Sequence, residues 1–292
     1  MKFVFVGQNI LGGLTLKELI KDNKVPSFVV TRKSDNYPNL VEEIAESHKI
    51  PFYKTSDINK EKEIIQKLSD LKPDIIFCSA WENIIKEPLL NIPKLGWVNF
   101  HPSFLPTYKG SSPLTWQLIN GEDFGGCTSH FMIAKVDAGK IIVREKIKIG
   151  PDDNSFTLRK KCGKLLGKLA VKTYDILSKD PEHKGFVPKG EKASYHPPRE
   201  KNKLIDWNDK VVNIYNLIRG LSPYPCTILA YKNKELRIAK AEITKLKSSS
   251  IGSIKKDNDG KLLVGTKDFF IKIISLRISD EIVDDYADRI GD

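Results

Sequence analysis

The sequence predicts an α/β protein in which a parallel sheet flanked by helices is followed by a small C-terminal β-barrel. Strand-like apolar runs alternate with helix-like segments through the first half of the chain. Between residues 181 and 204 the composition shifts to Lys, Pro, Gly and His without an apolar period, which is typical of a linker. Short strand-like segments separated by turn residues follow. We therefore expect a first domain at 1–180, a linker at 181–204 and a β-rich domain at 205–292.

The first elements alternate in type. KFVFVG (2–7) is an apolar strand that opens on glycines, LTLKELIKD (14–22) has helical spacing, and PSFVVT (26–31) is a second strand. Further helices are expected at 39–48 and 60–71, and further strands at 50–54, 74–80 and 97–101. Strands separated by helices imply parallel pairing, and the ligand site of such a sheet lies at the carboxyl ends of its strands. His101 sits at such an end.

The later elements change the pattern. A helix is expected at 113–121, strands at 127–133 and 140–149, and a long helix from about Ser155, its expected N-cap, to Leu177. In the last third, a helix at 211–221 ends at SPYP, and strands are expected at 227–232, 235–243, 261–266 and 269–276. Turn signals between these short strands, NK and DNDG, favour a small barrel or sandwich.

Length and composition exclude several classes of protein. The chain has 292 residues, 40% hydrophobic and 29% charged, which is a globular balance. No window approaches the roughly 18 uninterrupted apolar residues of a membrane span. The start, MKFVFVGQNILGG, has too little apolar length before its glycines for a secretory signal. We expect a cytoplasmic protein with no membrane partner.

The cysteines indicate the redox state of the chain, and the net charge indicates the kind of partner it binds. Cys78, Cys127, Cys162 and Cys226 stand far apart with no C-x-x-C pair, so buried reduced thiols are expected rather than a disulfide framework or a zinc site. The net charge of +11 favours anionic partners. Residues 179–279 hold 21 Lys and Arg against 11 Asp and Glu, which suits an anionic partner but equally a solvated Lys-rich surface.

Three polar residues surround the stretch WVNFHPSFLPTYKG (97–110). Asn99 and His101 lie at the end of the expected strand, and Asp137 follows 36 residues after His101 in VDAGK. If Asp137 lies on the turn between strands 127–133 and 140–149, it folds back over the same strand ends. An amide donor, an imidazole and a carboxylate then suit acyl transfer to an amine. A hydrogen-bonded structural histidine is the alternative.

These motifs resemble a known family. NFHPSFLPTYKGSSPLTWQLINGE followed by GCTSHFMIAKVDAGKII is similar to the 10-formyltetrahydrofolate-dependent formyltransferases, whose pattern is Asn-x-His, a Ser-Leu-Leu-Pro loop and Asp-x-Gly after a strand. The likeness extends over nearly the whole chain. It implies a Rossmann-like formyltransferase domain followed by a small, OB-like C-terminal barrel.

The resemblance implies roles for particular residues. Asn99, His101 and Asp137 would be catalytic. Residues bordering the folate would be Ser103, Phe104, Leu105 and Pro106, then Ile133, Ala134, Lys135 and Val136, and also Trp81, Asn83, Ile84 and Ile85, which occupy the stretch that walls the pterin pocket. Phe104 replaces the usual Leu, which affects pocket shape more than chemistry. Trp81 and Phe104 can equally be core or rim aromatics.

The mechanism implied is direct transfer from 10-formyltetrahydrofolate. A neutral amine attacks the formyl carbon, Asn99 and protonated His101 stabilise the oxyanion, and a proton returns to the leaving nitrogen. Asp137 is expected to raise the pKa of His101 by pairing with its cation. No metal is expected, because no ligand-spacing motif supports a site at His101, His130 and Asp137.

Members of this family differ in the amine that they formylate, and their motifs differ accordingly. VGQNILGG lacks the Gly-Asn-Gly-Ser-like phosphate loop of the glycinamide ribonucleotide enzymes, which also lack a C-terminal barrel, and it is not a dinucleotide fingerprint. IRGLSPYP and the basic β domain resemble methionyl-tRNA formyltransferases. However, VTRKSDNYPNLVEEIAE lacks their long Gly/Arg/Lys-rich insertion, and YKGSSPLTWQLINGE, with Trp116, resembles the N-formyltransferases of nucleotide-linked amino sugars.

We therefore expect a nucleotide-linked 4-amino sugar as acceptor, with initiator Met-tRNA as the alternative. Tyr108, Lys109 and Arg219 are candidate acceptor-binding residues, although Arg219 could instead pair with Asp206. A formyltetrahydrofolate hydrolase and a non-catalytic RNA-binding protein are less favoured. The hydrolase usually carries an N-terminal regulatory domain, and an RNA-binding module would leave the three polar residues without a role.

Overall fold

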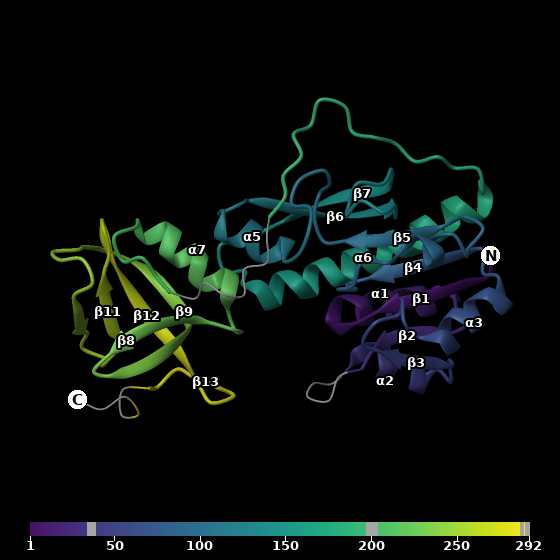
Figure 1. Cartoon of the computed structure of the whole chain (residues 1–292). Helices are drawn as coiled ribbons and strands as arrows, with labels where there is room; N and C mark the ends of the chain where they lie inside the picture. Colours follow the sequence, from purple (N-terminus) through teal and green to yellow (C-terminus); the bar gives the residue numbers. More distant parts are fainter. Residues whose placement is uncertain (34–38, 197–203, 287–288, 290–292) are drawn as a thin grey trace. The chain divides into compact units, whose positions relative to one another are not determined.

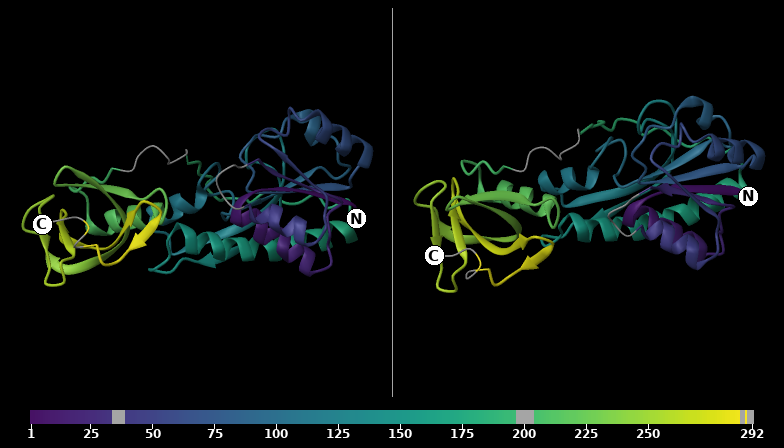
Figure 2. Two further views of the ribbon diagram at one scale, coloured as in Figure 1. Left: turned by 90° about the horizontal axis from the view of Figure 1, so that it is seen from below. Right: turned by 60° about the horizontal axis from the view of Figure 1, so that its bottom comes forward.

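The computed structural model describes residues 1–33, 39–196, 204–286 and 289, and the chain forms two compact units (Figures 1 and 2). The first unit comprises residues 1–113, 124–148 and 159–196, and the second comprises 114–123, 149–158 and the chain from 197 onward. Of the expected linker, 197–203 lie outside the described residues, and 181–196 group with the first unit. The expected limits at 1–180 and 205–292 stay a prediction.

A seven-stranded sheet forms the centre of the first unit, in the order β3-β2-β1-β4-β5-β6-β7 (Figure 1). Its strands are β1 (Phe3–Gly7), β2 (Val29–Arg32), β3 (Phe52–Thr55), β4 (Ile75–Ser79), β5 (Trp97–His101), β6 (Phe124–Phe131) and β7 (Ile141–Lys148). Strands β1 to β5 pair in parallel, as the alternation predicts. Strands β6 and β7 are antiparallel, because the connection between them is too short for a crossover.

Helices cover both faces of this sheet. They are α1 (Asn9–Lys21), α2 (Leu40–Ser47), α3 (Lys62–Leu71), α4 (Glu87–Leu90) and, from Arg159 onward, α6 (Ser155–Lys179). Helix α5 (Pro113–Ile119) groups from Leu114 onward with the second unit. Successive strand residues point to opposite faces. On one face Val4 and Ile76 pack with Leu68 of α3, and on the other Tyr174 of α6 meets the ring of Phe3. This two-sided burial explains the uninterrupted apolar runs of β1 and β4.

Helix α1 begins earlier than its apolar spacing predicts, at Asn9 rather than near Leu14. The two glycines that resemble a turn signal lie inside the helix. A Cβ added at Gly13 would stand 2.4 Å from Cγ of Leu40, so the missing side chain lets α1 pack closely against α2. The glycines therefore serve packing between helices rather than a turn.

Helix α6 is capped by a different residue from the one expected. Ser155 is its first helical residue, and the side chain of Asn154 accepts the backbone N–H groups of Phe156 and Thr157, both at 3.0 Å. Asn154 is therefore the N-cap, one residue before the predicted one. Across the described ranges, neither α6 nor any other helix has the length and apolar character needed to cross a membrane.

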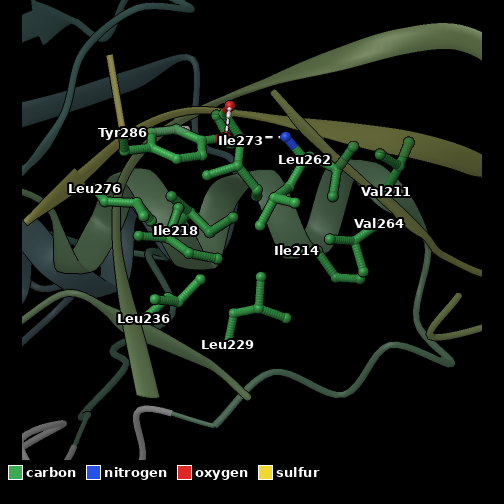
Figure 3. Packing of buried hydrophobic residues seen from close by; sticks show 13 residues of the cluster. Val211, Ile214, Ile218, Leu229, Leu236, Leu262, Val264, Ile273, Leu276 and Tyr286 are labelled. Carbon is green, nitrogen blue, oxygen red and sulfur yellow. Dashed lines mark hydrogen bonds between the residues drawn. The ribbon is translucent and has the colours of Figure 1, made fainter. Parts of the chain in front are cut away.

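The second unit contains an antiparallel sheet in the order β10-β11-β12-β9-β8, with β13 on β12. Its elements are α7 (Val211–Leu221), β8 (Thr227–Tyr231), β9 (Lys234–Lys247), β10 (Ile254–Lys256), β11 (Leu262–Gly265), β12 (Phe269–Ile278) and β13 (Glu281–Val283). Figure 3 shows its core, where Ile214 and Ile218 of α7 pack with sheet residues. The Tyr286 hydroxyl accepts the N–H of Leu262 and donates to the carbonyl of Ile273. The expected β-rich unit is confirmed.

Candidate active site

Strand β5 brings two polar side chains to one end of the sheet. Asn99 and His101 are two residues apart, so their side chains share a face of the strand. In the neighbouring strands Asn99 lies opposite Cys78 of β4 and His130 of β6. Asn99 and His101 thus lie where the parallel strands end, between a parallel and an antiparallel neighbour.

Asp137 joins them from the connection between β6 and β7. Its Oδ2 atom lies 3.6 Å from Nδ1 of His101, and its Oδ1 atom accepts from Nδ2 of Asn99 at 3.4 Å. The side chains of His101 and Asp137 are only 6% and 8% exposed. The structure therefore brings the three residues together in a buried cluster.

Gly139 explains the Asp-x-Gly motif in physical terms. A Cβ at this position would stand 1.7 Å from the carbonyl oxygen of Phe131. That carbonyl belongs to the end of β6, so the close approach draws the connection tightly over the strand. Any side chain at Gly139 would push the connection away and carry Asp137 with it.

The ring of His101 is oriented by a backbone carbonyl. Its Nε2 atom lies 2.9 Å from the carbonyl oxygen of Tyr108. A carbonyl only accepts, so Nε2 carries the hydrogen and, in the neutral ring, Nδ1 carries the lone pair. At 3.6 Å from Asp137, Nδ1 is too far for a hydrogen bond and stays available to a third group.

The charge state of His101 differs from the expectation. Burial lowers the pKa of His101, and the opposing influences of the Asp137 carboxylate and the Tyr108 carbonyl do not restore it. Asp137 raises this pKa, as predicted, but burial lowers it by more, so the net shift is downward. Desolvation of the cation outweighs the ion pair, so the ring rests as a neutral base.

Asp137 remains ionised. Burial alone would raise its pKa, but the pKa is held well below the usual range by His101, by His130 and by the N–H of Gly110. That N–H donates to Oδ2 at 2.8 Å. The left-handed conformation of Gly110 (φ +92°), which glycine adopts without strain, helps to aim this group.

His130 also belongs to this cluster, whereas from the sequence it was named only as a possible metal ligand. Its Nδ1 lies 2.9 Å from the carbonyl of Phe131, so Nδ1 carries the hydrogen. Its Nε2 therefore accepts from Nδ2 of Asn99 at 3.2 Å. This contact fixes which end of the Asn99 amide faces the site. The pairing of His130 opposite Asn99 is the signal that would have found it.

The loop 103–106 is anchored to β6. The hydroxyl of Thr128 donates to the carbonyl of Ser103 at 2.7 Å and accepts the N–H of Leu105 at 3.1 Å. Ser103 and Leu105 are buried, and Pro106 is half-buried. The ring of Phe104 lies under the guanidinium of Arg144, 4.1 Å from its centroid. Phe104 thus has a packing partner on β7, and its contact with folate stays a prediction.

The other expected folate segments present apolar side chains to solvent. Ile84, Ile133 and Val136 are 63%, 51% and 40% exposed on the segments that follow β4 and β6. Asn59 fixes the first segment by donating to the carbonyl of Ile84 at 3.0 Å. Of the remaining expected contacts, Ala134, Lys135 and Asn83 are exposed, Trp81 is half-buried and Ile85 is buried.

Trp81 has an unusual indole nitrogen. Its Nε1 atom is buried and has no hydrogen-bond partner among the described residues, while its ring packs against the core beneath β4. The buried side chain of Ile85 leaves only its backbone for a ligand.

The candidate acceptor residues lie in both units. The ring of Tyr108 is buried and stacks on His196 with a centroid distance of 4.6 Å, and Lys109 is half-buried. Arg219 belongs to the second unit, where it donates to Asn216 Oδ1 and to the carbonyl of Gly150. The ion pairs among described residues do not include one between Arg219 and Asp206. Within the described ranges, no three His, Cys, Asp or Glu side chains are grouped to hold a metal ion.

Two family models match the chain. Residues 4–173 match "Formyl transferase", and residues 199–284 match "Formyl transferase, C-terminal domain". A methionyl-tRNA formyltransferase of Clostridium beijerinckii is 34% identical over 261 residues, covering 85% of this chain and 82% of that protein. The bifunctional polymyxin resistance protein ArnA of Wigglesworthia glossinidia brevipalpis is 35% identical over 286 residues, covering 96% of this chain but 43% of that protein.

Solved structures share the fold. The sugar 3N-formyl transferase WlaRD, with dTDP and 5-N-formyl-THF, superposes with a TM-score of 0.71 at 18% identity, covering 93% of this chain and 96% of that one. An N-formyltransferase of Helicobacter canadensis, in complex with folinic acid and dTDP-3-aminofucose, gives 0.70 at 19% identity, covering 94% and 98%. Both likenesses span the two units of the chain.

Proposed function

This chain belongs to the formyl transferase family, and from that premise we propose that it transfers the formyl group of 10-formyltetrahydrofolate to the amine of a nucleotide-linked 4-amino sugar. As a member of this family it is a folate-dependent N-formyltransferase. The observation that carries the proposal is the buried cluster of Asn99, His101 and Asp137 at the end of β5.

Asn99 is proposed to stabilise developing negative charge. One hydrogen of its Nδ2 is engaged by His130, and the other faces Asp137 at the longer distance of 3.4 Å. This second hydrogen makes the longer contact, and it would turn from Asp137 to the formyl oxygen as an amine adds to the carbon. A pre-aimed donor in a buried site is worth more than the same donor in water.

His101 is proposed to move the proton. Its neutral Nδ1 accepts the proton of the attacking amine, while Nε2–H stays on the carbonyl of Tyr108. The imidazolium that forms is stabilised by the ionised Asp137 at 3.6 Å. His101 then returns the proton to the leaving nitrogen, so the residue acts in turn as base and acid.

The residues around the cluster fit a folate. Ile84, Ile133 and Val136, on the segments that follow β4 and β6, offer exposed apolar side chains to a ligand. The unpartnered indole N–H of Trp81 is a donor that a small local shift would present to a polar ring. Segments 81–85 and 133–136 would hold the pterin, and the bound folate would supply the formyl group.

A short connection supports the sugar acceptor. Strand β2 ends at Arg32, and Asn39 caps α2 by accepting the N–H of Val41. Only residues 33–38 separate them, with one Lys and one Asp. The resemblance implies that tRNA enzymes carry a long basic insertion here to grip the acceptor stem. A nucleotide sugar needs only a small anionic contact.

Initiator Met-tRNA is the second candidate, and two observations favour it. Relatives at 32–34% identity are methionyl-tRNA formyltransferases, and they cover most of this chain. Strand β9 also exposes five basic side chains, Lys234, Arg237, Lys240, Lys245 and Lys247, against two exposed acidic ones, Glu235 and Glu242. Such an excess of basic groups suits a phosphate backbone.

The deciding experiment measures tetrahydrofolate release from 10-formyltetrahydrofolate. dTDP- and UDP-linked 4-amino sugars are compared with initiator Met-tRNA and with no acceptor, using His101→Ala as the inactive control. Turnover only with a nucleotide sugar supports the proposal. Turnover only with Met-tRNA replaces it with the second candidate, and equal release without any amine identifies a hydrolase.

A further inference from the structure

The backbone of residues 108–110 orients two members of the catalytic cluster. The carbonyl of Tyr108 receives Nε2–H of His101, and the N–H of Gly110 binds Oδ2 of Asp137. These two groups select the His101 tautomer and hold the carboxylate beside the ring. Whatever fixes residues 108–110 therefore fixes the proton-transfer geometry.

A second segment of the first unit runs alongside this backbone. Lys109 forms a parallel bridge with Tyr195. The N–H of Ser194 donates to the carbonyl of Pro106 at 3.2 Å, and the Ser194 carbonyl accepts the N–H of Lys109 at 2.9 Å. The N–H of His196 donates to the carbonyl of Lys109 at 3.2 Å. This ladder gives residues 106–109 a partner that the sheet does not provide.

Side chains of the same segment complete the contact. The hydroxyl of Ser194 accepts the N–H of Tyr108 at 2.8 Å. The ring of His196 stacks on Tyr108 with an interplanar angle of 12°. The ring of Tyr195 passes so close to Gly110 that a Cβ there would stand 2.7 Å from it. Ser194 and His196 thus contact Tyr108, and Tyr195 lies against Gly110.

The segment is also fixed to β7. Phe186 and Ile141 exchange both backbone hydrogen bonds at 2.8 Å. Arg144 donates to both carboxylate oxygens of Glu191, at 2.8 and 2.6 Å, and its guanidinium faces the ring of Phe186. A bidentate pair is geometrically specific, so the segment has defined anchors at both ends.

We infer that residues 186–196, which we name the strap, position the catalytic cluster, with Ser194 as the positioning residue that holds Tyr108 and thereby His101. The strap is therefore part of the catalytic machinery rather than a linker between units. This inference rests on the proposed formyl transfer for its kinetic consequence. Its structural consequence, the tautomer of His101, does not depend on any reaction.

Ser194 is the position at which the inference is tested. Ser194→Ala removes the acceptor for the N–H of Tyr108 and keeps the backbone ladder, whereas Ser194→Thr retains a hydroxyl. Glu191→Gln weakens the anchor on β7 without touching the ladder. Ser56→Ala, an exposed serine outside the strap, is the matched control.

The first readout is the side-chain ¹⁵N spectrum of the full-length protein labelled on its five histidines, with the His101 signals assigned by their loss in His101→Gln. Wild type, Ser194→Thr and Ser56→Ala are expected to show His101 as the Nε2–H tautomer. Ser194→Ala is expected to show a mixture of the two neutral tautomers, and Glu191→Gln a smaller change in the same direction.

The second readout is kinetic. Ser194→Ala is expected to lower kcat about tenfold with little change in KM for the folate, because displaced proton-transfer groups slow chemistry more than binding. A folded Ser194→Ala protein with a wild-type tautomer and kcat would overturn the inference. A tautomer change in a protein that proves unable to transfer formyl would uphold the strap and reject the proposed function.

Discussion

At the scale of single residues, the two histidines of the site differ in which ring nitrogen carries the hydrogen. His101 and His130 lie in one cluster, but a carbonyl engages Nε2 of the first and Nδ1 of the second. One ring therefore keeps a free Nδ1, and the other offers Nε2 to Asn99. The two histidines thus differ through the position of one hydrogen each, and this difference suits His101 to the proposed proton transfer and His130 to orienting the Asn99 amide.

Asn99 provides the most direct test of charge stabilisation. We expect Asn99→Ala to reduce kcat by about 10²–10³-fold, because one oxyanion donor is lost. Asn99→Asp should be at least as impaired, because a carboxylate places negative charge where negative charge develops. Steady-state kinetics with the identified acceptor checks both. A wild-type kcat in Asn99→Ala would remove this residue from the mechanism.

The pH profile tests the neutral base. The proposed mechanism needs His101 unprotonated, and the pKa of His101 lies below the ordinary 6.5, so kcat/KM should hold its plateau as pH falls through 6.5 and decline only below that. The charged or titratable neighbours that set this limb are Asp137, His130 and Lys109.

Asp137→Asn should move the acid limb further down. The carboxylate favours the His101 cation, so its removal lowers the pKa again, and the unpaired imidazolium also makes the reaction slower. The profile of kcat/KM against pH, with and without the substitution, measures the displacement. An acid limb that rises in Asp137→Asn contradicts this account.

At the scale of elements, the sequence predicts those features that repeat a pattern. Strand β5 occupies residues 97–101 as expected, because its apolar run is buried on both faces. The start of α1 was missed, because Gly13 packs against a helix that is distant in sequence. The strap was missed for a similar reason: its ladder with residues 106–109 joins backbone groups, which leave no trace in side-chain spacing.

The β6–β7 connection carries a prediction at this scale. Gly139→Ala should lower kcat/KM about 10- to 100-fold while the protein stays folded, because the added Cβ meets the Phe131 carbonyl and displaces Asp137. Ala138→Gly is the matched control on the same connection. Activity together with thermal unfolding distinguishes displacement from misfolding, and a fully active Gly139→Ala would contradict the tight approach.

At the scale of the whole molecule, the net charge can be read from the sequence, but the burial of a particular side chain cannot. The net charge of +11 was evident from composition, whereas the lowered pKa of His101 was not, because burial is a property of the assembled fold. The cluster of Asn99, His101 and Asp137 could be anticipated from strand ends. His130 needed the register between β5 and β6.

Salt dependence separates the two acceptors. A nucleotide sugar presents a diphosphate, so its KM should rise only a few-fold between 50 and 200 mM salt, whereas six or more phosphate contacts would weaken binding by about 10³-fold or more. The measurement is KM for each acceptor across this range. A steep dependence with the preferred acceptor would favour a nucleic acid.

The strap also determines where the chain can be cut when its C-terminal part is exchanged for that of a relative. A composition-based cut near residue 180 would keep Asn99, His101 and Asp137 but discard Ser194, Tyr195 and His196. In such a chimera the strap would come from the relative and would lie against Tyr108 and Gly110 of this chain, to which it is not matched. A chimera made to change the acceptor should therefore be joined after His196, so that Asn99, His101 and Asp137 stay with the strap of their own chain.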